Sequence, residues 1–233
     1  MAFFCFTVTC MKKITSITFL LFFVLIFGFA QDITTAGAFF SAVSERYGKI
    51  RDYVVDMRIT IGSSSQYGTA MFKRPDRLRI DFRSPAEQFI VFNGNTLSIY
   101  LPQYGTILSQ EVEQSSAGAA SLSTPQGLSL IKRAYTIAYE SSAAPVPLDE
   151  GSSEKVIVLI MNRKSAAETF RTLRVSISPD SQLIRRIEAV PISGGKITFN
   201  FSNYRINAGI RDKNFVFDSP PTAQVSNNFL FAD

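Results

Sequence analysis

Apolar and polar residues alternate along most of the chain beyond residue 50. Between Tyr53 and Ile61 every second position is apolar, with the exception of the extra Val54, and the same period of two recurs at 78–82, 173–177 and 197–201. Because successive side chains of a strand point to opposite faces of a sheet, these runs predict strands with one buried and one solvated face. Shorter strands are predicted at 67–72, 88–92, 96–101, 156–161 and 183–189.

Turn-forming residues separate these runs, as in Arg74-Pro75-Asp76, Asn93-Gly94-Asn95, 178–181 and 193–195. Proline and glycine at such positions favour tight turns, and short strands joined by tight turns make an antiparallel meander. Roughly nine or ten strands of this kind predict a strongly curved sheet or barrel without parallel βαβ crossovers.

Two segments have helical rather than strand periodicity. Residues 33–47 form a predicted amphipathic helix that Gly48 ends. A stretch rich in Ser, Ala and Gly at 113–130 interrupts the meander and leads into a short helical pattern after Pro125. A second soft stretch follows at 141–153. A long excursion inside a meander is either a disordered loop or a functional segment such as a lid, and composition leaves both open.

The N-terminus predicts a secretory signal. Lys12 and Lys13 precede an apolar run from Ile14 to Phe27, and small residues follow at Gly28 and Ala30. This order of features is typical of a signal peptide, with Met11 the expected start and cleavage expected after Ala30. The expected mature chain, residues 31–233, is then a single domain released outside the cytoplasm.

Composition excludes several classes of site. Histidine and tryptophan are absent, and both cysteines, Cys5 and Cys10, fall in the first ten residues. Triads that use histidine and cysteine-based metal sites therefore have no residues to build them. The carboxylates between residues 56 and 87 show no paired pattern, so neither catalysis nor a metal or other cofactor is expected. The 24 basic residues against 19 acidic ones are too evenly interleaved for nucleic-acid binding.

Three blocks resemble the periplasmic outer-membrane lipoprotein carriers of the LolA type. The first is Met71 to Ile80, with its Lys-Arg-Pro turn; the second is Gln88 to Pro102, an apolar strand, an Asn-Gly turn and then Thr-Leu-Ser-Ile-Tyr-Leu-Pro. The third is Asn214 to Pro221, with its Phe-Val-Phe-Asp-Ser-Pro run. Together with the predicted signal and opening helix, their order covers nearly the whole mature chain.

The resemblance implies a mainly β fold with helices, an incomplete, strongly curved antiparallel β-barrel covered by a helical lid. It also implies a hydrophobic cavity that takes acylated lipoproteins from an inner-membrane ABC-type transporter towards an outer-membrane acceptor. A monomer is expected. The family's lid-holding arginine corresponds to Arg74, and the lid to 113–135. Two positions depart from the family pattern: Leu78 replaces an aromatic residue and Ser98 a tryptophan.

The expected site has two parts. Lid gating is assigned to Arg74, Leu78, Leu128 and Ile131. The predicted cavity lining comprises Met57, Ile59, Ile80, Phe82, Phe89, Val91, Leu97, Ile99, Val175, Phe199 and Phe201.

Plainer interpretations remain for these residues. The alternating apolar face fits a filled core as well as a cavity. Arg74 is either solvated or bonded to the lid, and Arg77, Arg79 and Arg83 are either a solvated face or a docking patch for an acidic partner. The alternative function is a periplasmic lipid-binding or envelope-stress-sensing module of the same fold; a purely structural envelope protein is the third possibility.

Overall fold

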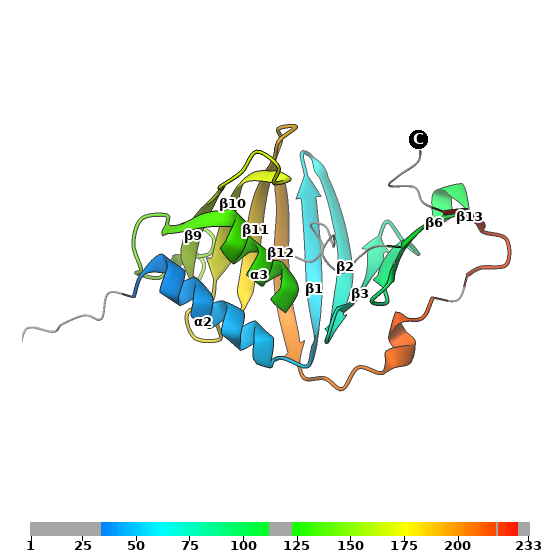
Figure 1. Cartoon of the computed structure of the whole chain (residues 1–233), viewed down its shortest axis with the longest axis horizontal. Helices are drawn as coiled ribbons and strands as arrows, with labels where there is room; N and C mark the ends of the chain where they lie inside the picture. The colour runs from blue at the N-terminus through cyan, green and yellow to red at the C-terminus, as the bar shows by residue number, and fades with distance from the viewer. Residues whose placement is uncertain (1–33, 112–122, 218, 228–233) are drawn as a thin grey trace, which may run out of the picture. The chain divides into compact units, whose positions relative to one another are not determined.

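The alternating segments make one continuous, curved sheet. The computed structural model describes residues 34–111, 123–217 and 219–227. Within these residues a 13-stranded sheet has the order β13-β6-β5-β4-β3-β2-β1-β12-β11-β10-β9-β7, with β8 paired to β9 (Figure 1). The sheet does not close, because β13 and β7 end the order without pairing to each other. The predicted fold, mainly β with an incomplete, strongly curved antiparallel barrel, is confirmed.

The strands have these bounds. The first half of the sheet contains β1 Asp52–Ile61, β2 Ser64–Lys73, β3 Arg77–Ser84, β4 Phe89–Phe92, β5 Thr96–Leu101 and β6 Thr106–Glu111. The second half contains β7 Tyr135–Tyr139, β8 Val146–Pro147, β9 Lys155–Arg163, β10 Phe170–Ile177, β11 Ile184–Pro191 and β12 Ile197–Ile206, and β13 Gln224–Asn227 returns to the first half.

Nine of these strands coincide with predicted ones, and four were not predicted: β6, β7, β8 and β13. Tyr135, expected at the end of a helical pattern, instead begins β7. The pairing is antiparallel throughout except between β13 and β6, which run parallel. The predicted meander therefore holds for neighbouring strands, but not for this edge.

The two halves of the sheet meet at β1, which pairs with β2 on one side and with β12 on the other. The register shifts between Val54 and Asp56 on β1, and between Tyr67 and Gly68 on β2. Such bulges increase the local twist and bend the strand. At Gly68 the strands approach so closely that a Cβ atom would lie 2.5 Å from the carbonyl oxygen of Asp81.

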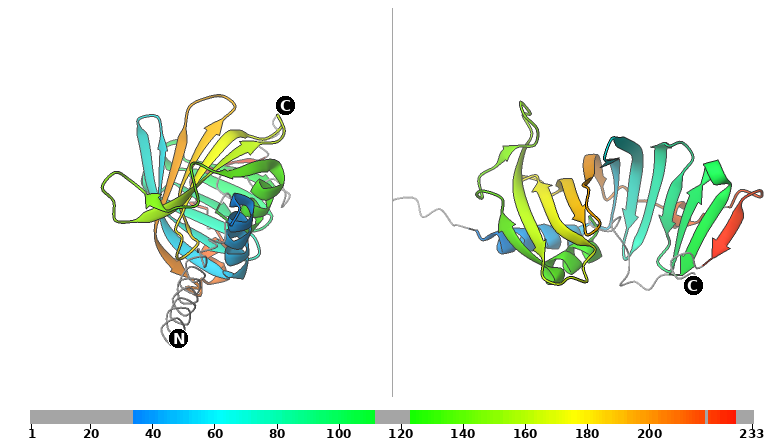
Figure 2. Two further views of the ribbon diagram at one scale, coloured as in Figure 1. Left: turned by 90° about the vertical axis from the view of Figure 1, so that its left-hand side faces the viewer. Right: turned by 90° about the horizontal axis from the view of Figure 1, so that it is seen from above.

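Two described helices lie over the β9–β12 side of the sheet (Figures 1 and 2). Helix α2, Ala36–Lys49, begins where the Thr35 hydroxyl accepts a hydrogen bond from the Ala38 amide at 3.2 Å. The helix continues through Gly48 to Lys49, so the predicted last helical residue, Tyr47, is two residues early. Helix α3, Pro125–Ala134, is capped in the same way by Thr124 and has proline at its first position, where the missing N–H costs no bond.

The buried Tyr47 and Tyr53 and the half-buried Tyr204 connect α2 to the centre of the sheet. The Tyr47 hydroxyl accepts a bond from the Ile184 amide at 3.0 Å, and the Tyr204 hydroxyl donates to the carbonyl of the same residue at 2.9 Å. Tyr53 packs edge-on against Tyr47 and stacks on Phe72. Burial raises the pKa of all three phenols. The three phenols are therefore protonated and uncharged in the folded protein at neutral pH.

A C-terminal strap, residues 207–217 and 219–227, crosses the outer face of the first half of the sheet (Figure 1). It contains a short 3-10 helix, η3 Asp212–Phe215; a second such turn, η1 Pro102–Tyr104, precedes β6. Lys73 Nζ donates to the Ile210 carbonyl at 2.7 Å, and the ring of Phe217 lies 4.2 Å from that of Phe89. The strap ends in β13, so it covers the edge that β6 would otherwise expose.

Candidate functional site: an apolar hollow

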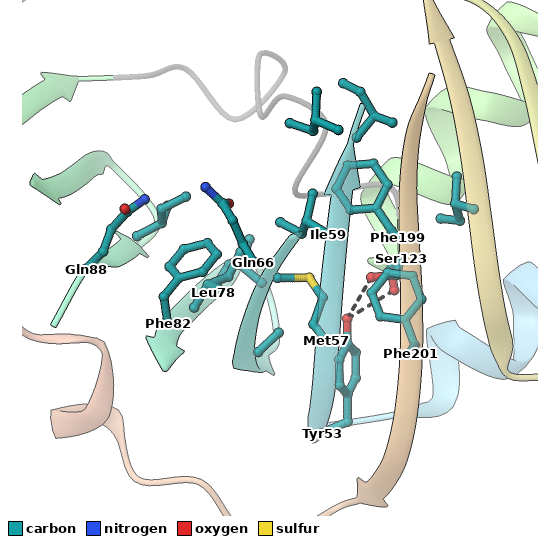
Figure 3. Close-up of a pocket in the computed structure, with 16 residues that line it drawn as sticks. Tyr53, Met57, Ile59, Gln66, Leu78, Phe82, Gln88, Ser123, Phe199 and Phe201 are labelled. Carbon is teal, nitrogen blue, oxygen red and sulfur yellow. Dashed lines mark hydrogen bonds between the residues drawn. The ribbon is translucent and has the colours of Figure 1, made fainter. Parts of the chain in front are cut away.

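A hollow of about 230 Å³ lies on the inner face of the sheet where β1, β2, β3 and β12 meet (Figure 3). The lining that the described residues provide is mainly aliphatic and aromatic, and none of these residues is charged. The lining residues are Tyr53, Met57, Ile59, Ile61, Gln66, Ala70, Leu78, Ile80, Phe82, Gln88, Ile90, Ser123, Ile187, Ile197, Phe199 and Phe201.

Strand register explains why these side chains converge. On β1 and β12, Ile59 lies opposite Phe199, and Met57 lies opposite Phe201. Directly opposed residues of antiparallel strands place their side chains on the same face. On the far side, Ile80 pairs with both Ala70 and Ile90, so β2, β3 and β4 contribute to the same face.

At the inner end of the hollow, a hydrogen bond links the sheet to the start of α3. The Tyr53 hydroxyl lies 3.2 Å from the Ser123 carbonyl oxygen, to which it donates, and 3.3 Å from the Ser123 hydroxyl (Figure 3). Both residues are buried. A buried hydroxyl without a partner is costly, and here the two residues satisfy each other. This hydrogen bond therefore holds Ser123 against Tyr53 at this end of the hollow.

The outer end is open to solvent. Ile61 is 52% exposed, an unusual fraction for a large aliphatic side chain at the edge of an apolar hollow. Ile197 lies opposite Ile61 across β12 and β1, and it is half-buried, as are Gln66 and Gln88 in the same lining. A ligand thus has a way in at the end opposite Tyr53.

The structure brings together six of the predicted lining residues. Met57, Ile59, Ile80, Phe82, Phe199 and Phe201 all line the hollow. Leu78, expected in gating, also lies in its wall. Leu128 and Ile131, expected in the lid, are buried in the main core from α3. Residues 112–122 of the expected lid lie outside the described residues.

Five predicted lining residues lie elsewhere. Phe89 and Val91 are on the opposite face of β4, because Ile90 between them faces the hollow; Phe89 packs there against Phe217. Val175 is in the filled core at 1% exposure. Leu97 and Ile99 share the inner face with Ile90 and Phe92 but lie beyond the hollow.

Residues that the sequence reasoning left out of the lining include Tyr53, Ile61, Ala70 and Ile197. Tyr53 and Ile61 belong to the same alternating run as Met57 and Ile59, so the period of two already contained them. Ser123 had no such signal, because it reaches the hollow only through the placement of α3.

Arg74 is exposed and bonds to α2 rather than to α3. Its Nη1 donates to the Gly48 carbonyl at 2.7 Å, in the last turn of the helix, where carbonyls lack helical partners and a cation is favourable. The neighbouring Pro75 carbonyl accepts a bond from Gln126 of α3. The Lys-Arg-Pro turn consequently contacts both helices, although Arg74 itself contacts one.

The three arginines of β3 are all paired within the chain. Arg79 binds Asp81, Arg77 binds Asp212, and Arg83 binds Asp56. This favours the plain interpretation of a solvated, internally neutralised face over a docking patch.

The described residues contain no group of His, Cys, Asp and Glu arranged to hold a metal. Likewise, none of the helices in the described ranges combines the length and hydrophobicity that a membrane span requires. The described part of the chain thus combines an open curved sheet, two covering helices and an apolar hollow.

Comparison with known proteins identifies the family. Residues 61–218 match the family model described as outer membrane lipoprotein carrier protein LolA. The chain therefore belongs to the LolA family. It is 25% identical over 158 residues to the outer-membrane lipoprotein carrier protein of Pseudomonas paraeruginosa, covering 68% of this chain and 70% of that protein. The protein of the same name from Albidiferax ferrireducens is 23% identical over 162 residues, covering 68% and 71%.

A solved structure shares the fold. The crystal structure of an uncharacterized conserved protein from Thermus thermophilus superposes with a TM-score of 0.55 at 12% identity, covering 81% of this chain and 98% of that one.

Proposed function

We propose that this chain is a periplasmic carrier that shields the acyl chains of lipoproteins between the inner and outer membranes. The observation that carries the proposal is the uncharged apolar hollow with one open end, in a member of a lipoprotein carrier family. The expected signal peptide, cleaved after Ala30, would deliver the chain to that compartment. An inner-membrane ABC-type transporter would load it, and an outer-membrane acceptor would unload it.

The energetics of the cargo explain why a hollow suffices. Exposing an acyl chain to water costs roughly 0.8 kcal/mol per methylene, so about fourteen methylenes cost on the order of 11 kcal/mol. Non-directional burial offsets that cost without fixing the cargo by many polar bonds, and so permits release. The proposed work requires no nucleophile, base or metal.

The hollow must enlarge to accept such a chain. Its volume of about 230 Å³ is below the roughly 300–1,000 Å³ of ordinary ligand pockets. Displacement of helix α3 would enlarge the hollow. Ser123, just before this helix, bonds to Tyr53 at the inner end, and Leu128 of the helix packs into the core. Opening would break the Tyr53–Ser123 and Gln126–Pro75 bonds.

The test is to fill the hollow. Ile59→Trp places an indole in the wall, whereas Ile192→Trp makes the same change at a side chain that is 49% exposed and outside the hollow. Binding of a synthetic diacylglyceryl-cysteine lipopeptide that carries a fluorescent label on its peptide is measured by fluorescence anisotropy, which reads the unaltered protein and both variants in the same way. We expect Ile59→Trp to weaken binding at least tenfold and Ile192→Trp to leave it unchanged.

Equal binding by both variants, or none by the unaltered protein, contradicts the proposal. Extraction of the protein purified from periplasm distinguishes the alternative: co-purifying acylated lipoprotein supports a carrier, and free phospholipid supports a lipid-binding or stress-sensing module.

A further inference from the structure

Two glutamine side chains stand at the mouth of the hollow. Gln66 lies on β2 opposite Ile59, and Gln88 immediately precedes β4, where its backbone carbonyl accepts a bond from the Phe82 amide at 2.9 Å. Both are half-buried and both line the hollow. In Figure 3 both side chains are drawn near Phe82, with their amide ends on the same side of its ring. The two chain segments therefore each contribute a neutral amide to the lining.

These amides differ from the other polar groups of the hollow. Tyr53 and Ser123 bond to each other, whereas neither glutamine side chain bonds to any residue in the described ranges. Each amide offers two N–H donors and one carbonyl acceptor. Partial burial of such groups beside an apolar wall has a cost that a ligand bond would remove.

The chemistry of the mouth limits what it can bind. Among the residues that the structure describes, no lysine, arginine, aspartate or glutamate lines the hollow, so a phosphate or a free carboxylate would meet no countercharge from them. An ester or amide carbonyl is neutral and only accepts hydrogen bonds, which matches the N–H donors of the two glutamines. Such carbonyls occur where an acyl chain joins its head group, at the boundary between apolar and polar parts.

We infer that Gln66 and Gln88 hydrogen-bond the ester or amide carbonyls of acylated cargo and so set how deeply its tails enter, an inference that rests on the acyl-binding function proposed above. The apolar wall from Ile59 to Phe199 takes the tails, and the amide pair marks the point where the head group remains outside. The site consequently selects acyl linkages over bare or ether-linked hydrocarbon chains.

The experiment compares two ligands of equal chain length. One is the diacylglyceryl-cysteine lipopeptide, and the other is its dialkyl ether analogue, which lacks the two ester carbonyls and keeps the same peptide. We expect the unaltered protein to bind the acyl ligand about tenfold more tightly than the ether, as two neutral hydrogen bonds provide. In Gln66→Leu/Gln88→Leu the preference should fall to about onefold to twofold, with ether binding unchanged or tighter.

Gln103→Leu is the matched control. Gln103 is exposed in η1 and outside the hollow, so this variant should keep the preference. The inference is overturned if the unaltered protein binds both ligands equally, or if the double variant keeps the preference. Failure of the unaltered protein to bind either ligand overturns the proposed function instead. If the double variant does not fold, the comparison on the unaltered protein still decides.

Discussion

The Tyr53 hydroxyl donates to the Ser123 carbonyl across 3.2 Å, which links the inner end of the apolar hollow to the first residue before the cap of α3. Tyr53 comes from the central strand of the sheet, whereas Ser123 belongs to the segment that covers it. The bond is buried, so it holds α3 in place without competition from water.

Tyr53→Phe removes this bond and leaves the ring in place. We expect the free energy of unfolding to fall by about 1 kcal/mol and uptake of the lipopeptide to become about threefold to tenfold faster, because opening then breaks one bond fewer. Stopped-flow fluorescence measures uptake. Tyr104→Phe, at a ring that is 71% exposed, serves as the control and should change neither quantity. An unchanged uptake rate in Tyr53→Phe would show that α3 does not move during loading.

Arg74→Leu tests the contact between the Lys-Arg-Pro turn and α2. If the bond to Gly48 forms in the empty state, regaining it helps to drive release, so its loss should slow transfer of the lipopeptide to vesicles several-fold. Capture should change less than twofold. Arg51→Leu, a nearby exposed arginine, is the matched control. Equal effects on capture and release would mean that Arg74 acts only on overall stability.

The sequence predicts which side chains face the hollow only for strands that have one buried face and one solvated face. On β1 the alternation is clear, and it places Met57 and Ile59 correctly. On β4 all four residues, Phe-Ile-Val-Phe, are apolar, because the strap packs on the outer face and the hollow lies on the inner one. Periodicity carries no information about facing in such a run, and Phe89 and Val91 were assigned to the wrong face.

The strands missed by the sequence analysis have a different cause. β13 has the sequence Gln-Val-Ser-Asn and is exposed throughout, so its place depends on backbone pairing with β6 and not on buried side chains. Likewise the partner of Arg74 is a backbone carbonyl, which any residue at position 48 would supply. Contacts of this kind depend on the tertiary arrangement and have no local signal.

Gly68→Ala should destabilise the fold by about 1–3 kcal/mol or more, because the added Cβ meets the Asp81 backbone oxygen at 2.5 Å and neither strand can yield freely. Chemical denaturation measures the loss. Gly37→Ala provides a control of opposite sign, since a Cβ at this position of α2 has no neighbour within 4 Å and alanine favours helix by up to about 1 kcal/mol. Similar stabilities for the two variants would contradict the close approach of β2 and β3.

Removal of β13 should make the protein self-associate. A chain that ends at Phe217 keeps η3 but exposes the edge of β6, and unpaired edges recruit strands from other molecules. Light scattering after size exclusion should then show concentration-dependent oligomers, whereas we expect the full chain to give a monomer. Adding Leu108→Lys to the shortened chain should restore the monomer, since an edge lysine opposes pairing. A monomeric shortened chain without the lysine would rule out this role for the strap.

The buried phenols predict an alkaline limit to stability. Burial raises the pKa of Tyr47, Tyr53 and Tyr204 above the unfolded value of about 10. A raised pKa favours the protonated form in the folded state, so this contribution is complete below pH 10 and is lost as pH rises further. Part of the tyrosinate absorbance should therefore appear together with the loss of circular dichroism. If all eight tyrosines of the chain ionised before the protein unfolded, the placement of Tyr47, Tyr53 and Tyr204 against the core would be contradicted.

The junction of β1 with β12 also governs when the protein can assemble. Tyr53 lies opposite Ile206, so the middle of the sheet is made from segments near the two ends of the chain. The chain loses conformational entropy when this long loop closes, before the contacts between the two strands can stabilise it. Folding that depends on pairing between segments remote in sequence is therefore slow. A nascent chain has only one of the two partners of β1 until β12 has been synthesised, so the central seam of the sheet forms late.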